Sequence, residues 1–163
     1  MVARVTRDWG VRLIFEPGRL IVGNAGILLT EVIRVKPGAA CPFVILDAAM
    51  NDLMRPTLYE AWHSIDSVQP RGEEMVADVV GPICETGDTF AIARTLDRVE
   101  AGDLMIIRSA GAYAATMGST YNSRPLTAEV LVDGSRWAVI RERRDIEATI
   151  REENIPDWLS AAA

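Results

Sequence analysis

The chain has 163 residues, 49% of them hydrophobic and 25% charged, which is enough for one ordinary globular domain or two small ones. Its 17 basic and 23 acidic residues give a net charge of -6, so it has no general attraction for nucleic acid or anionic lipid. No apolar run approaches the roughly 18 residues of a membrane span, and the length excludes a complete (β/α)₈ barrel of about 250 residues. Two cysteines and one histidine exclude a Cys/His zinc cage, and we expect no metal site.

The N-terminal residues Met1 to Trp9 alternate arginine and valine. They lack the apolar segment of a signal peptide, so we expect a cytoplasmic protein. Lys36 is the only lysine among the 17 basic residues. It would be the only candidate side-chain amine if this chain performed Schiff-base chemistry alone.

Short apolar runs separated by turn residues fill the first part of the chain. Val11–Phe15 predicts a buried strand that a turn at 16–19 ends. Residues 20–31 are apolar with interspersed glycines and allow helix or strand. We favour a helix there that leads into a strand at Val32–Lys36. Phe43–Leu46 predicts another buried strand.

The pattern then changes from helical to β-rich. Near-helical apolar spacing over 51–62 predicts a helix whose first turns Pro56 perturbs. Asp133-Gly134 is a strong hairpin signal, and 144–153 predicts a surface helix. The later predicted strands are 77–83, 104–108, 128–132 and 136–141. Together these elements indicate a mainly β barrel or sandwich with short helices.

Two early clusters of polar residues allow a functional and a structural interpretation. Glu16-Pro17-Gly18-Arg19 follows a predicted strand, where α/β active sites place carboxylates and cations, but it also suits a tight turn with a surface ion pair. Arg55 and Tyr59 are four residues apart, so a helix would present both to an anionic ligand. A solvated arginine beside a packed tyrosine explains the same spacing.

Two later clusters are similarly open. Cys84-Glu85-Thr86-Gly87-Asp88 combines a thiol, carboxylates and a turn glycine, although a lone cysteine is usually a small buried hydrophobe. Gly111-Ala112-Tyr113 and the later 121–125 segment would let a ligand approach the backbone, or would simply pack a tyrosine after a strand. His63 shares no motif with other titratable groups, and we interpret it as structural.

In order and spacing, these segments resemble the C-terminal portion of the ornithine/diaminopimelate/arginine decarboxylases, which depend on pyridoxal phosphate. The resemblance covers about residues 10 to 145, and MNDLMRPTLYEAWH favours the diaminopimelate-specific members over the ornithine-specific ones. The segments that carry it are EPGR (16–19), GNAGILLT (23–30), LDAAMNDLMRPTLYEAWH (46–63), GPICETGD (81–88), AGDLMIIRSAGAYAATMGSTYNSRP (102–125) and AEVLVDG (128–134).

The resemblance implies a fold-type III enzyme, in which a (β/α)₈ barrel carries the Schiff-base lysine and a C-terminal β-domain completes the site. Residues 1–35 would be a remnant of that barrel, its last strand and helix, and 36–163 the β-domain. Lys36 does not match the barrel lysine. In the isolated chain we expect aggregation or disorder before about residue 36, because several apolar residues would be exposed. These are Leu13, Ile14, Phe15, Ile27, Leu28 and Leu29.

Site roles follow from the same resemblance. Glu16 resembles the carboxylate that pairs with the pyridine nitrogen of pyridoxal 5'-phosphate, and Gly18 resembles a residue that helps hold the phosphate. Tyr113 resembles a residue that touches both cofactor and substrate. The residues that would bind the distal carboxylate of the substrate are Arg19, Arg55 and Tyr59.

Cys84 resembles the residue that reprotonates the substrate carbon, and Glu85 one that binds the distal amine. Both would reach into the partner subunit's site in a homodimer. Asp88 would support this motif without touching the substrate. Two departures are Ala49, where glycine is usual, and Thr86, where serine is usual.

The implied activity is decarboxylation of meso-2,6-diaminopimelate to L-lysine, in lysine biosynthesis. It would require the barrel portion or a companion chain, because this chain lacks the Schiff-base lysine. Two alternatives are a non-catalytic dimerising β-domain and a decarboxylase of a related carboxy-polyamine or basic amino acid.

Overall fold

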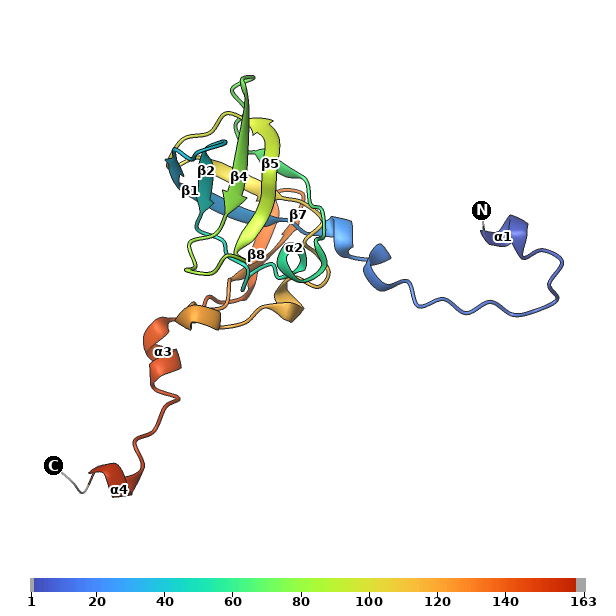
Figure 1. The fold of residues 1–163 in the computed structure, drawn as a ribbon. Helices are drawn as coiled ribbons and strands as arrows, with labels where there is room; N and C mark the ends of the chain where they lie inside the picture. Colours follow the sequence, from blue (N-terminus) through green and yellow to red (C-terminus); the bar gives the residue numbers. More distant parts are fainter. Residues whose placement is uncertain (1, 161–163) are drawn as a thin grey trace.

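The computed structural model describes residues 2–160. A β-rich body carries an extended N-terminal segment and a C-terminal tail that lead away from it (Figure 1). Its strands are β1 Leu28–Lys36, β2 Phe43–Leu46, β3 Ile65–Ser67, β4 Glu74–Val80, β5 Thr89–Asp97, β6 Leu104–Ile107, β7 Glu129–Asp133 and β8 Arg136–Arg141. Its helices are α1 Val2–Val5, α2 Arg55–Tyr59, α3 Ile146–Ile150 and α4 Asp157–Ser160, with 3₁₀ turns η1 Gly18–Leu20, η2 Gly23–Ala25, η3 Ala115–Met117 and η4 Tyr121–Ser123.

Six strands form one sheet in the order β3-β6-β1-β2-β4-β5. Only β2 and β4 pair in parallel, while the other neighbours are antiparallel. The edge strands β3 and β5 contact each other, so the sheet curls into a nearly closed barrel. This confirms the prediction of a mainly β domain. No described helix is long and apolar enough to cross a membrane.

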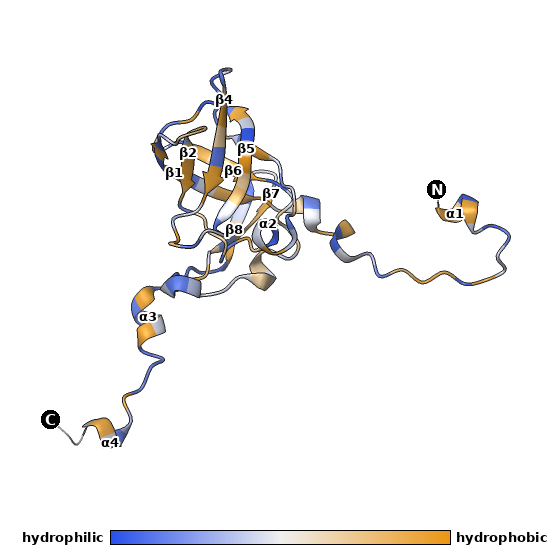
Figure 2. Ribbon diagram, viewed as in Figure 1, coloured by the Kyte–Doolittle hydropathy of each residue, from blue (hydrophilic) through white to orange (hydrophobic). Residues whose placement is uncertain are grey.

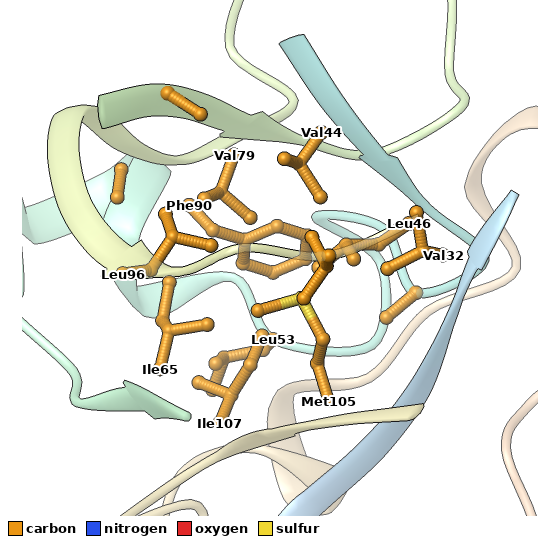
Figure 3. Close-up of a cluster of buried hydrophobic side chains, with 14 of the residues drawn as sticks. Val32, Val44, Leu46, Leu53, Ile65, Val79, Phe90, Leu96, Met105 and Ile107 are labelled. Atoms are coloured by element: carbon orange, nitrogen blue, oxygen red, sulfur yellow. The ribbon is translucent and has the colours of Figure 1, made fainter. Parts of the chain in front are cut away.

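The core lies inside this curled sheet. Figure 3 shows the side chains of Met105 and Ile107 from β6 facing those of β1, β2, β4 and β5. Val32, Val44 and Leu46 are fully buried, with a relative exposure of 0%. Burial of each such apolar side chain stabilises the folded state by about 1.5–3 kcal/mol. The six-stranded sheet is therefore a stable support for the loops and short helices that it carries.

The strand predictions for Val32–Lys36 and Phe43–Leu46 are confirmed by β1 and β2. β7 and β8 form the antiparallel hairpin that the Asp-Gly signal predicted, and Gly134 has a φ of 59°. The expected positive φ at Asp133 is wrong, because Asp133 pairs with Arg136 and the turn residues are Gly134 and Ser135. β7 and β8 form a separate two-stranded sheet, which lies over an apolar cavity of about 540 Å³.

The predicted strand over Val11–Phe15 and the predicted helix over 20–31 are wrong for this structure. Val11–Phe15 forms no strand, because a strand needs a neighbour to accept its backbone hydrogen bonds, and no strand within residues 2–160 pairs with it. Residues 20–31 form η1, η2 and the start of β1 instead of a helix. β1 crosses the expected boundary at residue 36, and the division into 1–35 and 36–163 stays a prediction.

The N-terminal segment before β1 contains many hydrophobic residues (Figure 2), and many of their side chains are exposed. Ile14 and Phe15 are 79% and 63% exposed. Ile27 and Leu29 are also exposed, whereas Leu28 is half-buried against the core, contrary to expectation. Aggregation of the isolated chain stays a prediction that this exposure supports.

Candidate functional site

Helix α2 is short because the sequence limits it at both ends. Pro56 stands in its first turn, where the missing N–H costs nothing, and Glu60 ends it in a left-handed conformation with a φ of 52°. The predicted helix over 51–62 is therefore reduced to five residues. Shortly before it, Asn51 donates to Ser119 O, and Asp52 accepts the hydroxyl of Thr127, so both side chains are used in tertiary hydrogen bonds.

Arg55, Tyr59 and Tyr113 lie together. The guanidinium carbon of Arg55 is 5.3 Å from the ring centre of Tyr59 and 5.9 Å from that of Tyr113. Among the described residues, the Arg55 Nε is buried without a hydrogen-bond partner. A cation held between two aromatic rings with an unused donor is suited to bind a carboxylate.

Tyr113 is positioned by a close contact between two chain segments. The Ala110 N–H donates to Gly26 O at 2.9 Å, and the Gly111 N–H donates to Gly23 O at 3.0 Å. A Cβ on Gly111 would lie 1.9 Å from Val22 O, so glycine is required there. The GNAG segment thereby fixes the start of the loop that carries Tyr113.

The 81–88 segment forms a tight turn with Cys84 and Glu85 exposed on it. Asp88 is buried, with a relative exposure of 2%. Its carboxylate accepts the N–H of Ile83 at 2.8 Å and that of Met50 at 2.6 Å. Burial raises the pKa of Asp88 above its ordinary value, although these two donors oppose the shift.

The turn also contacts α2. The Thr57 hydroxyl donates to Gly87 O at 2.5 Å. Thr57 lies two residues after Arg55, so the Cys84–Glu85 turn is tied to the helix that bears Arg55 and Tyr59.

Glu16, Gly18 and Arg19 stand apart from this group. All three are exposed in the N-terminal segment, and Gly18 has a φ of 55°. Within residues 2–160, Glu16 and Arg19 make no hydrogen bond or ion pair. The structure therefore brings together Arg55, Tyr59, Tyr113 and the Cys84–Glu85 turn, but not the N-terminal candidates.

Arg124 is a key residue whose role the sequence analysis missed. Its Nε donates to Asn51 Oδ1 at 3.1 Å, and a terminal nitrogen donates to Asp47 O. Asp52 lies 3.7 Å from that guanidinium. Its position within YNSRP, a segment that follows Tyr113, was the available signal, but nothing local indicated its partners 73 and 77 residues away.

His63 is buried and its Nδ1 lies 2.8 Å from Arg108 O, in accordance with a structural role. Ala49 is also fully buried, and its N–H donates to Asp52 at 2.9 Å, so the added methyl fits. Thr86 is exposed and its carbonyl accepts the Thr89 hydroxyl at 3.2 Å.

The geometry defines a β-domain that presents an arginine-tyrosine cluster beside a thiol-bearing turn. A family described as "Pyridoxal-dependent decarboxylase, C-terminal sheet domain" matches residues 12–111. The chain belongs to this family of pyridoxal-dependent ornithine, diaminopimelate and arginine decarboxylases.

Relatives at high identity carry one name. The chain is 57% identical over 159 residues to diaminopimelate decarboxylase of Zymomonas mobilis, covering 98% of this chain and 38% of the relative. It is 54% identical to that of Neisseria meningitidis serogroup A, covering 88% and 35%. The chain thus spans little more than a third of the length of these relatives.

Solved structures give the same picture. Diaminopimelate decarboxylase from M. jannaschii superposes with a TM-score of 0.87 at 38% identity, covering 95% of this chain and 36% of that one. The Helicobacter pylori enzyme complexed with L-lysine superposes with a TM-score of 0.81 at 40% identity, covering 93% and 37%.

Proposed function

We propose that this chain is the C-terminal portion of a diaminopimelate decarboxylase, a cytoplasmic enzyme that converts meso-2,6-diaminopimelate to L-lysine. It would act together with a (β/α)₈ barrel portion, in the same polypeptide or as a companion chain. Alone it would be inactive, because its only lysine, Lys36, lies exposed at the end of β1, outside the cluster. The Arg55 cluster carries the substrate assignment.

The substrate's distal end is what distinguishes diaminopimelate from plain diamines and basic amino acids, since it bears a second carboxylate. Arg55 offers a guanidinium with an unused, buried Nε, held between Tyr59 and Tyr113. A substrate carboxylate at the terminal nitrogens of the half-buried Arg55 would pair with its positive charge, whereas an ammonium group would be repelled by it. Arg19 would add a second cation from the N-terminal segment.

The residues for pyridoxal 5'-phosphate fit in chemical type. Glu16 is a carboxylate with no partner of its own among the described residues, and it would hold the pyridine nitrogen protonated. Gly18, in the left-handed conformation, would let its backbone approach the phosphate, and Tyr113 would contact the cofactor. The bound cofactor supplies an electron sink for the carbanion that loss of CO₂ leaves.

Cys84 would return a proton to the substrate carbon, and Glu85 would bind the distal amine. Both side chains are exposed on the turn, which is required if they reach into the partner subunit's site of a homodimer. An exposed thiol at a turn can deliver a proton and be replenished from solvent.

Co-expression of this chain with the barrel portion of the Zymomonas mobilis relative tests the proposal. Lysine formation from meso-diaminopimelate is the readout, with L-ornithine as a competing substrate. We expect lysine from the pair and none from either portion alone. If both portions are folded and no product forms, the non-catalytic alternative replaces the proposal.

Arg55→Ala tests the substrate class. Arg55 is half-buried, and a bound substrate carboxylate would cover it further, so loss of this charge should cost about 2–5 kcal/mol in transition-state binding. Arg98→Ala, at a surface ion pair with Glu73, is the matched control and should leave kcat/KM unchanged. If Arg55→Ala leaves the discrimination between diaminopimelate and its competitor almost unchanged, Arg55 does not read the substrate. That result would favour the alternative in which the substrate is a carboxy-polyamine or a basic amino acid.

A further inference from the structure

The Cys84–Glu85 turn owes its shape to hydrogen bonds made inside residues 81–88. The Gly81 N–H donates to Asp88 O at 2.9 Å, and the Asp88 N–H donates to Glu85 O at 3.0 Å. The Asp88 carboxylate closes the loop by accepting the Ile83 N–H. These bonds shape the turn, but they do not fix where it lies relative to the rest of the cluster.

Two side-chain bonds do that. The other oxygen of Asp88 accepts the N–H of Met50, 38 residues earlier, in the loop that leads into α2. The Thr57 hydroxyl donates to Gly87 O from α2 itself. The first bond therefore joins Asp88 of the turn to Met50, near α2. The second joins Thr57 of α2 to Gly87 of the turn.

The space around Asp88 is closed. A Cβ on Gly81 would lie 2.2 Å from one carboxylate oxygen of Asp88, so that oxygen packs directly on the Gly81 backbone. Asp88 also accepts a backbone N–H at each oxygen, which an asparagine cannot do because one end of its amide is a donor. Few other side chains could take this position.

We propose that Asp88 and Thr57 are positioning residues, which together hold the Cys84–Glu85 turn at a fixed distance from Arg55 and Tyr59. This inference rests on the proposed function, in which Cys84 and Glu85 serve the partner subunit's site and Arg55 and Tyr59 serve their own. Neither Asp88 nor Thr57 touches the substrate. The pair would tie the proton donor of one site to the carboxylate-binding residues of the other.

Amide hydrogen exchange of the 163-residue chain tests whether Asp88 and Thr57 hold the turn in place, and it needs no activity. The variants are Asp88→Asn and Thr57→Val, and the matched control is Thr95→Val, at an exposed position on β5. Loss of one hydrogen bond should speed exchange at the Glu85 and Asp88 amides by about tenfold, the equivalent of ~1.4 kcal/mol. Exchange within β6 should stay unchanged in all three.

The complemented enzyme gives the functional readout. A displaced turn should lower kcat by at least about fivefold in Thr57→Val, because Cys84 is misplaced. KM should rise by less than kcat falls, because Arg55 still binds the distal carboxylate even where Glu85 is displaced. Thr57→Ser, which restores the hydroxyl, should restore kcat. A merely structural role would give no such split and no such rescue.

The outcomes are distinguishable. If the wild-type pair makes no lysine, the proposed function fails and the positioning role fails with it. A second outcome is that the wild-type pair is active while Thr57→Val matches Thr95→Val in kcat or in the exchange rates of the Glu85 and Asp88 amides. In that case the positioning role of Asp88 and Thr57 is overturned and the proposed function stands. Should Asp88→Asn fail to fold, Thr57→Val and Thr57→Ser still decide the question.

Discussion

Arg124→Ala should destabilise the chain, because Arg124 joins the loop before α2 to the segment after Tyr113. Its guanidinium donates to Asn51 and to the carbonyl of Asp47, and it lies 3.7 Å from Asp52. The Asp52 side chain is only 5% exposed. Removal of Arg124 would leave that buried carboxylate without its cation.

The magnitude follows from two limits. Loss of a hydrogen bond to a charged group costs about 1.5–3 kcal/mol, and breaking a fully buried ion pair costs about 3–5 kcal/mol. Arg124 is 29% exposed, so water can partly replace it. Asp52 also keeps its bonds from Ala49 N–H and the Thr127 hydroxyl. We therefore expect a loss of about 2–3 kcal/mol, or about 4–12 °C in Tm.

Urea unfolding followed by circular dichroism measures this loss. Arg98→Ala is the control, because Arg98 and Glu73 are 54% and 67% exposed and such a pair contributes less than about 1 kcal/mol. Adding Asp52→Asn to Arg124→Ala removes the unpaired charge and should recover part of the loss. If Arg124→Ala and Arg98→Ala unfold at the same urea concentration, the reasoning is refuted.

Three further predictions concern the sheet, the loop contact and acid stability. Met105→Ala, at a residue with 0% exposure, should cost about 2–5 kcal/mol in urea unfolding, and a loss below 1 would contradict the core assignment. Gly111→Ala should break the bond to Gly23 O, so its amide should exchange faster in NMR; unchanged exchange would count against the close contact. Arg71 lowers the pKa of Asp103 below its ordinary 3.8, so the native state keeps this carboxylate ionised where the unfolded chain protonates it. That stabilisation is present above about pH 3.8 and lost as pH falls further, so Asp103→Asn should lower Tm at pH 7 and approach wild type in acid; a gap that persists at low pH would contradict this.

Local sequence signals were enough where an element is stabilised by its own residues. The Asp133-Gly134 hairpin formed as predicted because the turn alone selects its backbone conformation. Phe43–Leu46 formed because its apolar run has β1 and β4 on either side to pair with. β5, Thr89–Asp97, was not predicted, because its buried and exposed residues do not alternate: its register with β4 is irregular, and Ala93 has a φ of 45°.

Dependence on contacts from distant parts of the chain also explains why the predictions before residue 28 are wrong. Val11–Phe15 has the composition of a strand, but pairing requires a neighbour, and none of the described strands is paired with it. Residues 20–31 have apolar helix-forming residues, yet the contact of Gly26 with Gly111 requires extended backbone there instead. Such a contact, 85 residues away in sequence, leaves no local signal beyond the glycine itself.

The candidate site divides along the same line. Residues whose supports lie in this chain are held in place: Arg55 lies between two tyrosines, and Asp88 is enclosed by backbone. Glu16 and Arg19 have no partner among the described residues and lie in a segment with exposed apolar neighbours. A segment of that composition gains free energy only by burial, at about 25 cal/mol per Å². The segment before β1 should therefore become buried when a barrel portion covers it. In the proposed enzyme, that step would bring Glu16 to the cluster of Arg55, Tyr59 and Tyr113, which is already formed.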